Sequence, residues 1–172
     1  MSQASLLLRI RVLIVFFIAA LGISGLTAFP LVWEVTVLHR WLGPGTWLEQ
    51  VWPALAAWMD TVYAGLTSTD AAYPFLFYGT DWLAFAHIVI AIAFIGPLRD
   101  PVRNIWVIEF GMIACVLVLP LALIFGPLRG IPMFWRILDC AFGVAGIIPL
   151  WLTRWYIVQL ARIGQRVAAQ AT

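Results

Sequence analysis

Residues 105–125 read IWVIEFGMIACVLVLPLALIF and contain one charged side chain, Glu109. A helix needs about 17–25 mostly apolar residues to cross the hydrocarbon core of a bilayer, and this stretch has that length. Three more apolar stretches accompany it, at residues 12–33, 82–98 and 131–153. The sequence therefore predicts an all-α membrane protein, in which residues 1–172 form a single integral domain built as a four-transmembrane-helix bundle.

The composition indicates the same class. Of the 172 residues, 64% are hydrophobic and 10% are charged, and the mean hydropathy is +1.01. A soluble domain of this size could not cover so much apolar surface. The net charge is only +2, and the ten basic residues, all arginine, are spread along the chain rather than gathered as a nucleic-acid footprint requires. We therefore expect the lipid bilayer as the surroundings and no nucleic acid as a partner.

The arginines predict the orientation of the chain. Three groups flank the expected spans: Arg9 and Arg11, Arg99 and Arg103, and Arg154, Arg162 and Arg166. Because loops on the cytoplasmic side carry an excess of basic residues, we place all three groups there. This predicts a bacterial-type inner-membrane protein with both termini cytoplasmic and with the loop of residues 34–81 on the outer side.

The first apolar stretch also resembles parts of a secretory signal peptide. Arg9 and Arg11 precede it, and small residues occur at Ser24 and Gly25. The apolar run nevertheless continues to Trp33, which is longer than a signal peptide needs. We expect this stretch to remain as a membrane anchor.

The loop of residues 34–81 contains a helix signal. Thr46 and Glu49 have the spacing of a capping box, in which both side chains accept hydrogen bonds from the first amides of a helix. We expect an amphipathic interfacial helix over residues 47–65, bent near Pro53. Its polar face is acidic rather than basic, so capping the bundle is favoured over binding to anionic lipid.

The motif Gly-Pro-Leu-Arg occurs twice, at residues 96–99 and 126–129. Glycine and proline are common where helices end, arginine is favourable near a helix C-terminus, and a following proline suits the first turn of the next helix. Pro101 and Pro132 are the prolines that follow the two motifs and that we expect in the first turn of the next helix. We expect two tight hairpins that make spans two, three and four antiparallel neighbours.

Ionisable residues inside the spans need a partner or a wet cavity, because charge in the bilayer core is costly. Counting depth along the hairpins places Arg136 level with Asp81, and Asp139 follows Arg136 by one helical turn. We predict a polar cluster at the outer third of the bundle: Glu34, Asp81, His87, Arg136 and Asp139. It is either a salt-bridge cluster neutralised by Arg136 or a site where His87 passes protons or orients a polar head group.

A second group is predicted on the cytoplasmic side: Arg99, Asp100, Arg103 and Glu109. Pairing of Glu109 with an arginine at the membrane surface explains this group as structure. The alternative is that Glu109 faces the interior and begins a proton or ion path.

Aromatic residues are concentrated at the outer side of the expected spans. A belt of tryptophans at the interface is the simpler interpretation, and a hydrophobic entrance for lipid-like or quinone-like ligands is the alternative. In the segment YPFLFYGTDW, residues 73–82, we expect Gly79 and Thr80 to cap span two, with Asp81 favouring its N-terminus. The alternative is that this segment forms the rim of a ligand site with Arg136.

No cofactor or metal is predicted. Haem ligation by His39 and His87 is disfavoured, because the two histidines are expected at different depths. Two histidines and two cysteines in four separate regions do not form a zinc site. Cys115 and Cys140 lie in apolar surroundings that disfavour a reactive thiolate.

No catalytic motif occurs, so we expect a non-enzymatic membrane component, either a subunit of a complex or a small homo-oligomer. The outer polar cluster would then shape the contact with a heterologous membrane subunit or with lipid. Two alternatives stay open. One is a proton-coupled transporter or channel that uses Glu109, His87, Asp81 and Asp139, and the other is a redox or lipid-modifying enzyme that uses His87, Asp81 and Arg136 at the outer leaflet.

Overall fold

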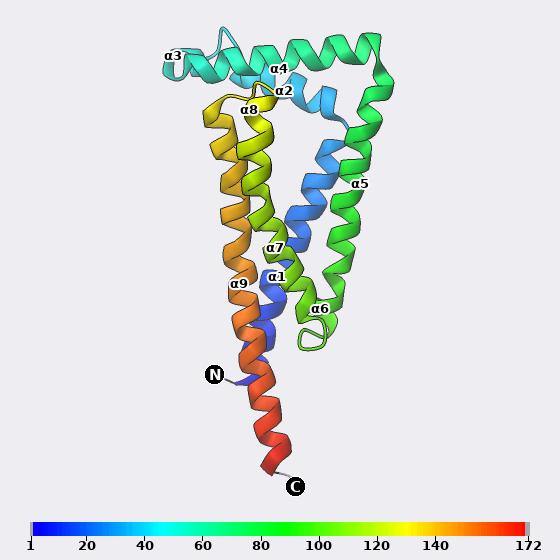
Figure 1. Ribbon diagram of the computed structural model, residues 1–172, viewed down its shortest axis with the longest axis vertical. Helices are drawn as coiled ribbons and strands as arrows, with labels where there is room; N and C mark the ends of the chain where they lie inside the picture. The colour runs from blue at the N-terminus through cyan, green and yellow to red at the C-terminus, as the bar shows by residue number, and fades with distance from the viewer. Residues whose placement is uncertain (1, 171–172) are drawn as a thin grey trace. The chain divides into compact units, whose positions relative to one another are not determined.

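A computed structural model of the protein describes residues 2–170 (Figure 1). This part of the chain is helical and contains no strand. Four of its helical segments are long and apolar enough to cross a membrane: Gln3–Ala28, Pro74–Arg99, Ile105–Leu128 and Met133–Gln170. The all-α class and the four candidate spans predicted from the sequence are thus confirmed, while the bundle and the amphipathic character of the loop helix stay predictions.

The chain forms two compact units. Unit 1 contains the residues up to Ala20 and those from Ile90 onward, and unit 2 is Leu21–Val89. The boundaries fall inside two helices, α1 (Gln3–Ala28) and α5 (Tyr78–Ala93).

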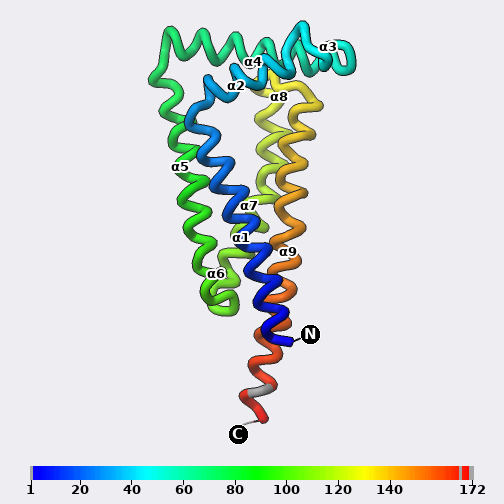
Figure 2. Tube along the Cα trace, turned by 180° about the vertical axis from the view of Figure 1, so that it is seen from behind, coloured from blue at the N-terminus to red at the C-terminus, as the bar shows by residue number. Residues whose placement is uncertain are grey.

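Unit 1 is built around α7 (Ile105–Pro120) and α9 (Met133–Gln170), which lie side by side in both views (Figures 1 and 2). Glycines allow the close approach. A Cβ atom on Gly143 would lie 2.5 Å from the carbonyl oxygen of Cys115, and one on Gly146 would lie 2.9 Å from its Sγ atom. Small residues at helix contacts are what packing in a membrane favours, so the two helices fit through their glycines.

The core of unit 1 is aliphatic and aromatic. The ring centroids of Phe17 and Phe94 are 4.8 Å apart. Gly111 leaves room for Phe94, because a Cβ atom there would lie 2.8 Å from the Phe94 ring. The fully buried large side chains of this unit are Leu6, Ile10, Ile14, Phe94, Ile108, Leu150 and Ile157.

The first Gly-Pro-Leu-Arg motif lies inside a helix rather than after one. Helix α6 (Ile95–Arg99) continues through Gly96 and Pro97, and the amide of Leu98 donates to the carbonyl of Phe94. The helix ends at Asp100, because the proline that follows disfavours the helical conformation of the residue before it. The Asn104 side chain then donates to the carbonyls of Gly96 and Asp100, which closes the turn.

The second motif forms a different ending. After α7 the chain continues as a π-helix, η2 (Leu121–Phe125), and then as α8 (Gly126–Leu128). The amide of Ile131 donates to the carbonyl of Gly126, and that of Gly130 donates to Pro127. With φ +71° at Gly130, this is a Schellman ending, in which the left-handed residue is usually glycine. The expected hairpin between the third and fourth spans is present here.

Unit 2 contains the whole loop between the first two spans, and that loop is largely helical. After α1 come α2 (Leu31–Leu42), α3 (Trp47–Val51), α4 (Pro53–Ala72) and the 3-10 helix η1 (Pro74–Phe77), which leads into α5. Helices α2 and α4 lie side by side (Figures 1 and 2). Helix α1 ends before Pro30, earlier than the expected 33, because proline cannot donate to the preceding turn.

The expected helix over residues 47–65 is divided in two. Trp52 lies outside the helical conformation, and Pro53 opens α4. The Thr46 hydroxyl accepts from the Leu48 amide at 3.3 Å, while a Glu49 carboxylate oxygen accepts from the Gly45 amide at 2.7 Å. Both predicted capping side chains are therefore engaged, although Glu49 reaches one residue further back than a capping box requires.

Candidate functional site

Three members of the predicted outer cluster belong to unit 2. Glu34 is in the first turn of α2, while Asp81 and His87 are on α5. Within unit 2 no hydrogen bond or ion pair joins these three side chains. The Nδ1 atom of His87 is 2.8 Å from the carbonyl oxygen of Leu83, a contact in which Nδ1 donates its hydrogen.

The other two members, Arg136 and Asp139, lie on α9 in unit 1. The stem of Arg136 covers Gly126, where a Cβ atom would overlap the Cδ and Cγ atoms of the arginine. The Nε atom of Arg136 is buried and has no hydrogen-bond partner. Although Asp139 follows by one helical turn, no ion pair joins it to Arg136 within unit 1.

The second predicted group is only partly brought together. A carboxylate oxygen of Asp100 accepts from the Arg103 amide at 3.1 Å, which is a turn contact. Glu109 pairs instead with Arg154 of α9, at 2.8 Å between Oε1 and Nε. The sequence did not predict Arg154 as the partner of Glu109. The hairpin of α7 and α9 nevertheless signals it, because the residues of α9 at the depth of Glu109 lie within two helical turns of Arg154.

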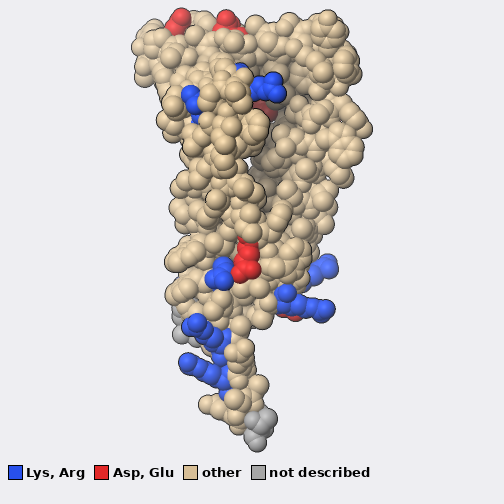
Figure 3. All heavy atoms as spheres, in the orientation of Figure 1, with Lys and Arg blue, Asp and Glu red and all other residues tan. Residues whose placement is uncertain are grey.

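Tyr156, two residues after Arg154 on α9, contacts Arg9 near the beginning of α1. Its hydroxyl lies 3.3 Å from Nη1 of Arg9, and the guanidinium carbon lies 5.7 Å from the centre of its ring. This gives Arg9 both a hydrogen bond and a cation–π contact. Figure 3 shows one face of the molecule, on which most of the basic atoms lie over the C-terminal part of α9 and at the turn after α6, while the surface between the two ends of the spans is largely uncharged.

Sequence reasoning also missed a contact between α2 and α4. The Nε2 atom of His39 lies 2.9 Å from Oδ1 of Asp60, and its ring stacks on Tyr63 with centroids 4.3 Å apart. Gly43 permits this position, because a Cβ atom there would lie 2.9 Å from the imidazole. Use of His39 Nε2 as a haem ligand would break the Asp60 contact. Within residues 2–170 no group of three or more His, Cys, Asp or Glu side chains is placed to hold a metal ion.

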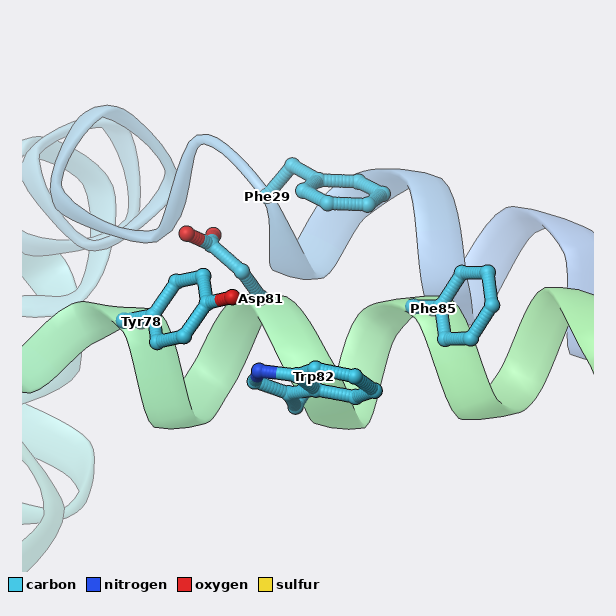
Figure 4. Close-up of a pocket in the computed structure, with 5 residues that line it drawn as sticks. All are labelled: Phe29, Tyr78, Asp81, Trp82 and Phe85. Carbon is cyan, nitrogen blue, oxygen red and sulfur yellow. The ribbon is translucent and has the colours of Figure 1, made fainter.

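A groove of about 290 Å³ opens along α5 in unit 2, and Figure 4 shows the residues that line it: Phe29, Tyr78, Asp81, Trp82 and Phe85. Tyr78, Trp82 and Phe85 follow the helical spacing that puts side chains on one face. Their rings meet edge to face, with centroids 6.1 Å apart for Tyr78 and Trp82 and 5.8 Å apart for Trp82 and Phe85. Phe29, the residue directly after α1, forms the opposite wall of the groove.

Gly25 sets the width of this groove. A Cβ atom on Gly25 would lie 2.8 Å from the carbonyl oxygen of Ala84 and 3.1 Å from Cβ of His87. The helices α1 and α5 therefore touch through backbone at this point, one helical turn before Phe29. The close approach brings the Phe29 ring over α5.

Asp81 lies in the first turn of α5, where the sequence predicts that its charge favours the helix N-terminus, whereas Gly79 and Thr80 do not cap the helix. Helix α5 begins at Tyr78, directly after η1, so Gly79 and Thr80 lie inside it. Within unit 2 the carboxylate of Asp81 accepts no hydrogen bond and makes no ion pair. The alternative interpretation, in which this segment forms the rim of a ligand site with Arg136, stays a prediction.

The chain was compared with known proteins: no protein-family model matches it, and neither the curated proteins nor the solved structures contain a significant match.

Proposed function

We propose that this protein is a non-catalytic, multi-pass membrane component that assembles with another membrane polypeptide or with copies of itself. The observation that supports the proposal is the state of Arg136 and Asp139. The two side chains are one turn apart on α9, yet among the described residues of unit 1 neither has an ion-pair partner.

Arg136 and Asp139 support an assembly contact because an unpaired charge inside a bilayer is costly. An ionisable side chain inside a span is stable when it faces a partner or water, and polar side chains between membrane helices form hydrogen bonds across them. A cation and an anion on one helix offer two such contacts. The predicted cluster adds the carboxylate of Glu34 as a further polar group for an assembly contact.

The apolar surface of the spans is consistent with this proposal. In the most apolar stretch of α9, only 11% of the residues are buried within the protein. In the corresponding stretch of Ile105–Leu128 the share is 28%. Lipid or a partner must cover the rest. We further propose a bacterial-type inner membrane with both termini cytoplasmic, on the basis of the arginine groups at the ends of the spans.

The transport alternative has less support from the contacts of Glu109. A proton path needs a carboxylate that is free to exchange its proton, whereas Glu109 is held by Arg154. The pair has the form of a structural link between α7 and α9.

The proposal is tested first by native mass spectrometry of the protein released gently from its own membrane without overexpression. A heterologous subunit that stays bound, or multiples of the 19.2 kDa chain, is expected. Monomers with no partner would overturn the proposal.

A pair of variants tests the part played by Arg136. Arg136→Ala should lower the fraction of protein in the assembly, while Arg129→Ala should not, because Arg129 is exposed at the turn. Should Arg136→Ala abolish expression and the added change Asp81→Ala restore it, the cluster would be an internal salt bridge, and its role in assembly would be wrong.

A further inference from the structure

The groove along α5 is lined almost entirely by apolar surface, and three polar groups lie beyond one of its ends, which we call the polar end. The wall consists of the rings of Phe29, Trp82 and Phe85, which are 46%, 57% and 52% exposed. In Figure 4 the carboxylate of Asp81, the hydroxyl of Tyr78 and the indole nitrogen of Trp82 lie toward one end, and the Phe85 ring lies toward the other. An elongated molecule with a polar head and an apolar tail matches this division.

The polar end combines one acceptor with two donors. Within unit 2 the Asp81 carboxylate has no hydrogen-bond or ion-pair partner, and neither the Tyr78 hydroxyl nor the Trp82 indole N–H makes a hydrogen bond. A carboxylate beside aromatic rings suits an ammonium group, since it adds charge attraction to the cation–π attraction of the rings. The two donors suit the oxygens of a phosphate.

The position of the groove along the span also suits a molecule with a polar head and an apolar tail. Pro74–Arg99 is one of the candidate spans, and the groove lies in its first half. Tyrosine and tryptophan side chains are favoured at the level of lipid head groups. Phe85 is one turn further along α5 than Asp81, toward the middle of the span.

We propose that this groove binds a membrane lipid whose head group carries both an ammonium and a phosphate, the chemistry of phosphatidylethanolamine. Asp81 holds the ammonium, Tyr78 and Trp82 donate to the phosphate, and an acyl chain lies along Phe29 and Phe85. The site lies within unit 2 and does not depend on the proposed assembly, so either proposal can fail alone.

The first test is native mass spectrometry of purified protein equilibrated with equal amounts of phosphatidylethanolamine and phosphatidylglycerol of the same acyl chains. The wild-type protein should retain the ethanolamine lipid preferentially, by about tenfold, the factor that one charge-assisted contact provides. Equal retention of the two lipids would overturn the proposal.

Variants then locate the site. Asp81→Asn should remove the preference, whereas Asp70→Asn should keep it, because Asp70 is an exposed carboxylate of the same unit outside the groove. Phe85→Ala should lower retention several-fold, while Phe75→Ala, an exposed ring outside the groove, should not. Equal effects of the groove variants and their controls would contradict the assignment.

A measurement on the wild-type protein alone covers the case in which Asp81→Asn does not fold. Phosphatidylethanolamine acetylated on its nitrogen keeps the phosphate and the chains but loses the ammonium charge. It should be retained no better than phosphatidylglycerol, and retention equal to that of the unmodified lipid would exclude a role for the ammonium.

Discussion

The Nε atom of Arg154 lies 2.8 Å from Oε1 of Glu109, which links the C-terminal half of α9 to the first half of α7. Both side chains are a little under half exposed, at 45% and 43%. The link lies on the same pair of helices as the close glycine contacts at Cys115. It therefore helps to fix how α7 and α9 are aligned along their length.

Breaking this pair should destabilise the α7–α9 contact only modestly. Because both groups are substantially exposed, the expected loss for Glu109→Gln is at most about 1 kcal/mol. Thermal unfolding in detergent measures it. The exchanged double variant Glu109→Arg with Arg154→Glu should recover most of the loss, and failure to recover would show that the pair is not the cause.

Gly143→Ala should lower the unfolding temperature, because the new methyl group would lie 2.5 Å from a backbone oxygen of α7. Overpacking of this kind costs about 1–3 kcal/mol. Gly164 on the same helix is the matched control, since a Cβ atom there meets nothing within 4 Å. Gly164→Ala should be neutral or stabilising, by up to about 1 kcal/mol, so equal shifts for the two variants would contradict the glycine contact.

Gly25→Ala should widen the groove by pushing α1 away from the carbonyl of Ala84. The expected result is weaker retention of the lipid proposed above, together with a lower unfolding temperature. Gly22→Ala, three residues earlier on α1 with open space around it, should change neither property. The comparison uses the same lipid competition, and unchanged retention in Gly25→Ala would show that the α1–α5 contact does not shape the groove.

The contact of His39 with Asp60 should hold α2 against α4. Asp60→Ala removes the carboxylate and leaves the His39–Tyr63 stacking, so we expect faster hydrogen exchange of the amides in the last turn of α2 while α7 and α9 stay protected. Asp70→Ala, at the far end of α4, is the control. If Asp60→Ala leaves exchange in α2 unchanged, stacking and chain connection alone keep the two helices together.

Local signals in the sequence were informative about helix ends. Thr46 accepts from an amide in the first turn of α3, and Glu49 accepts from the amide of Gly45 just before the helix. Pro53 and Pro30 mark the breaks at the places where a proline cannot donate. The Gly-Pro pairs were less informative, since α6 runs through Gly96 and Pro97 at the loss of one hydrogen bond. The helix end there depends on Pro101, which restricts Asp100.

The sequence alone determined that the protein is helical and has four segments able to cross a membrane, because length and apolarity are properties of each segment by itself. Only the tertiary structure decided that Glu109 meets Arg154, that His39 meets Asp60, and that Asp81 borders an aromatic groove. Those contacts depend on the rotation of each helix about its axis. A span that is apolar on nearly every side carries no periodic pattern to fix that rotation, so packing through residues such as Gly25 and Gly143 sets it.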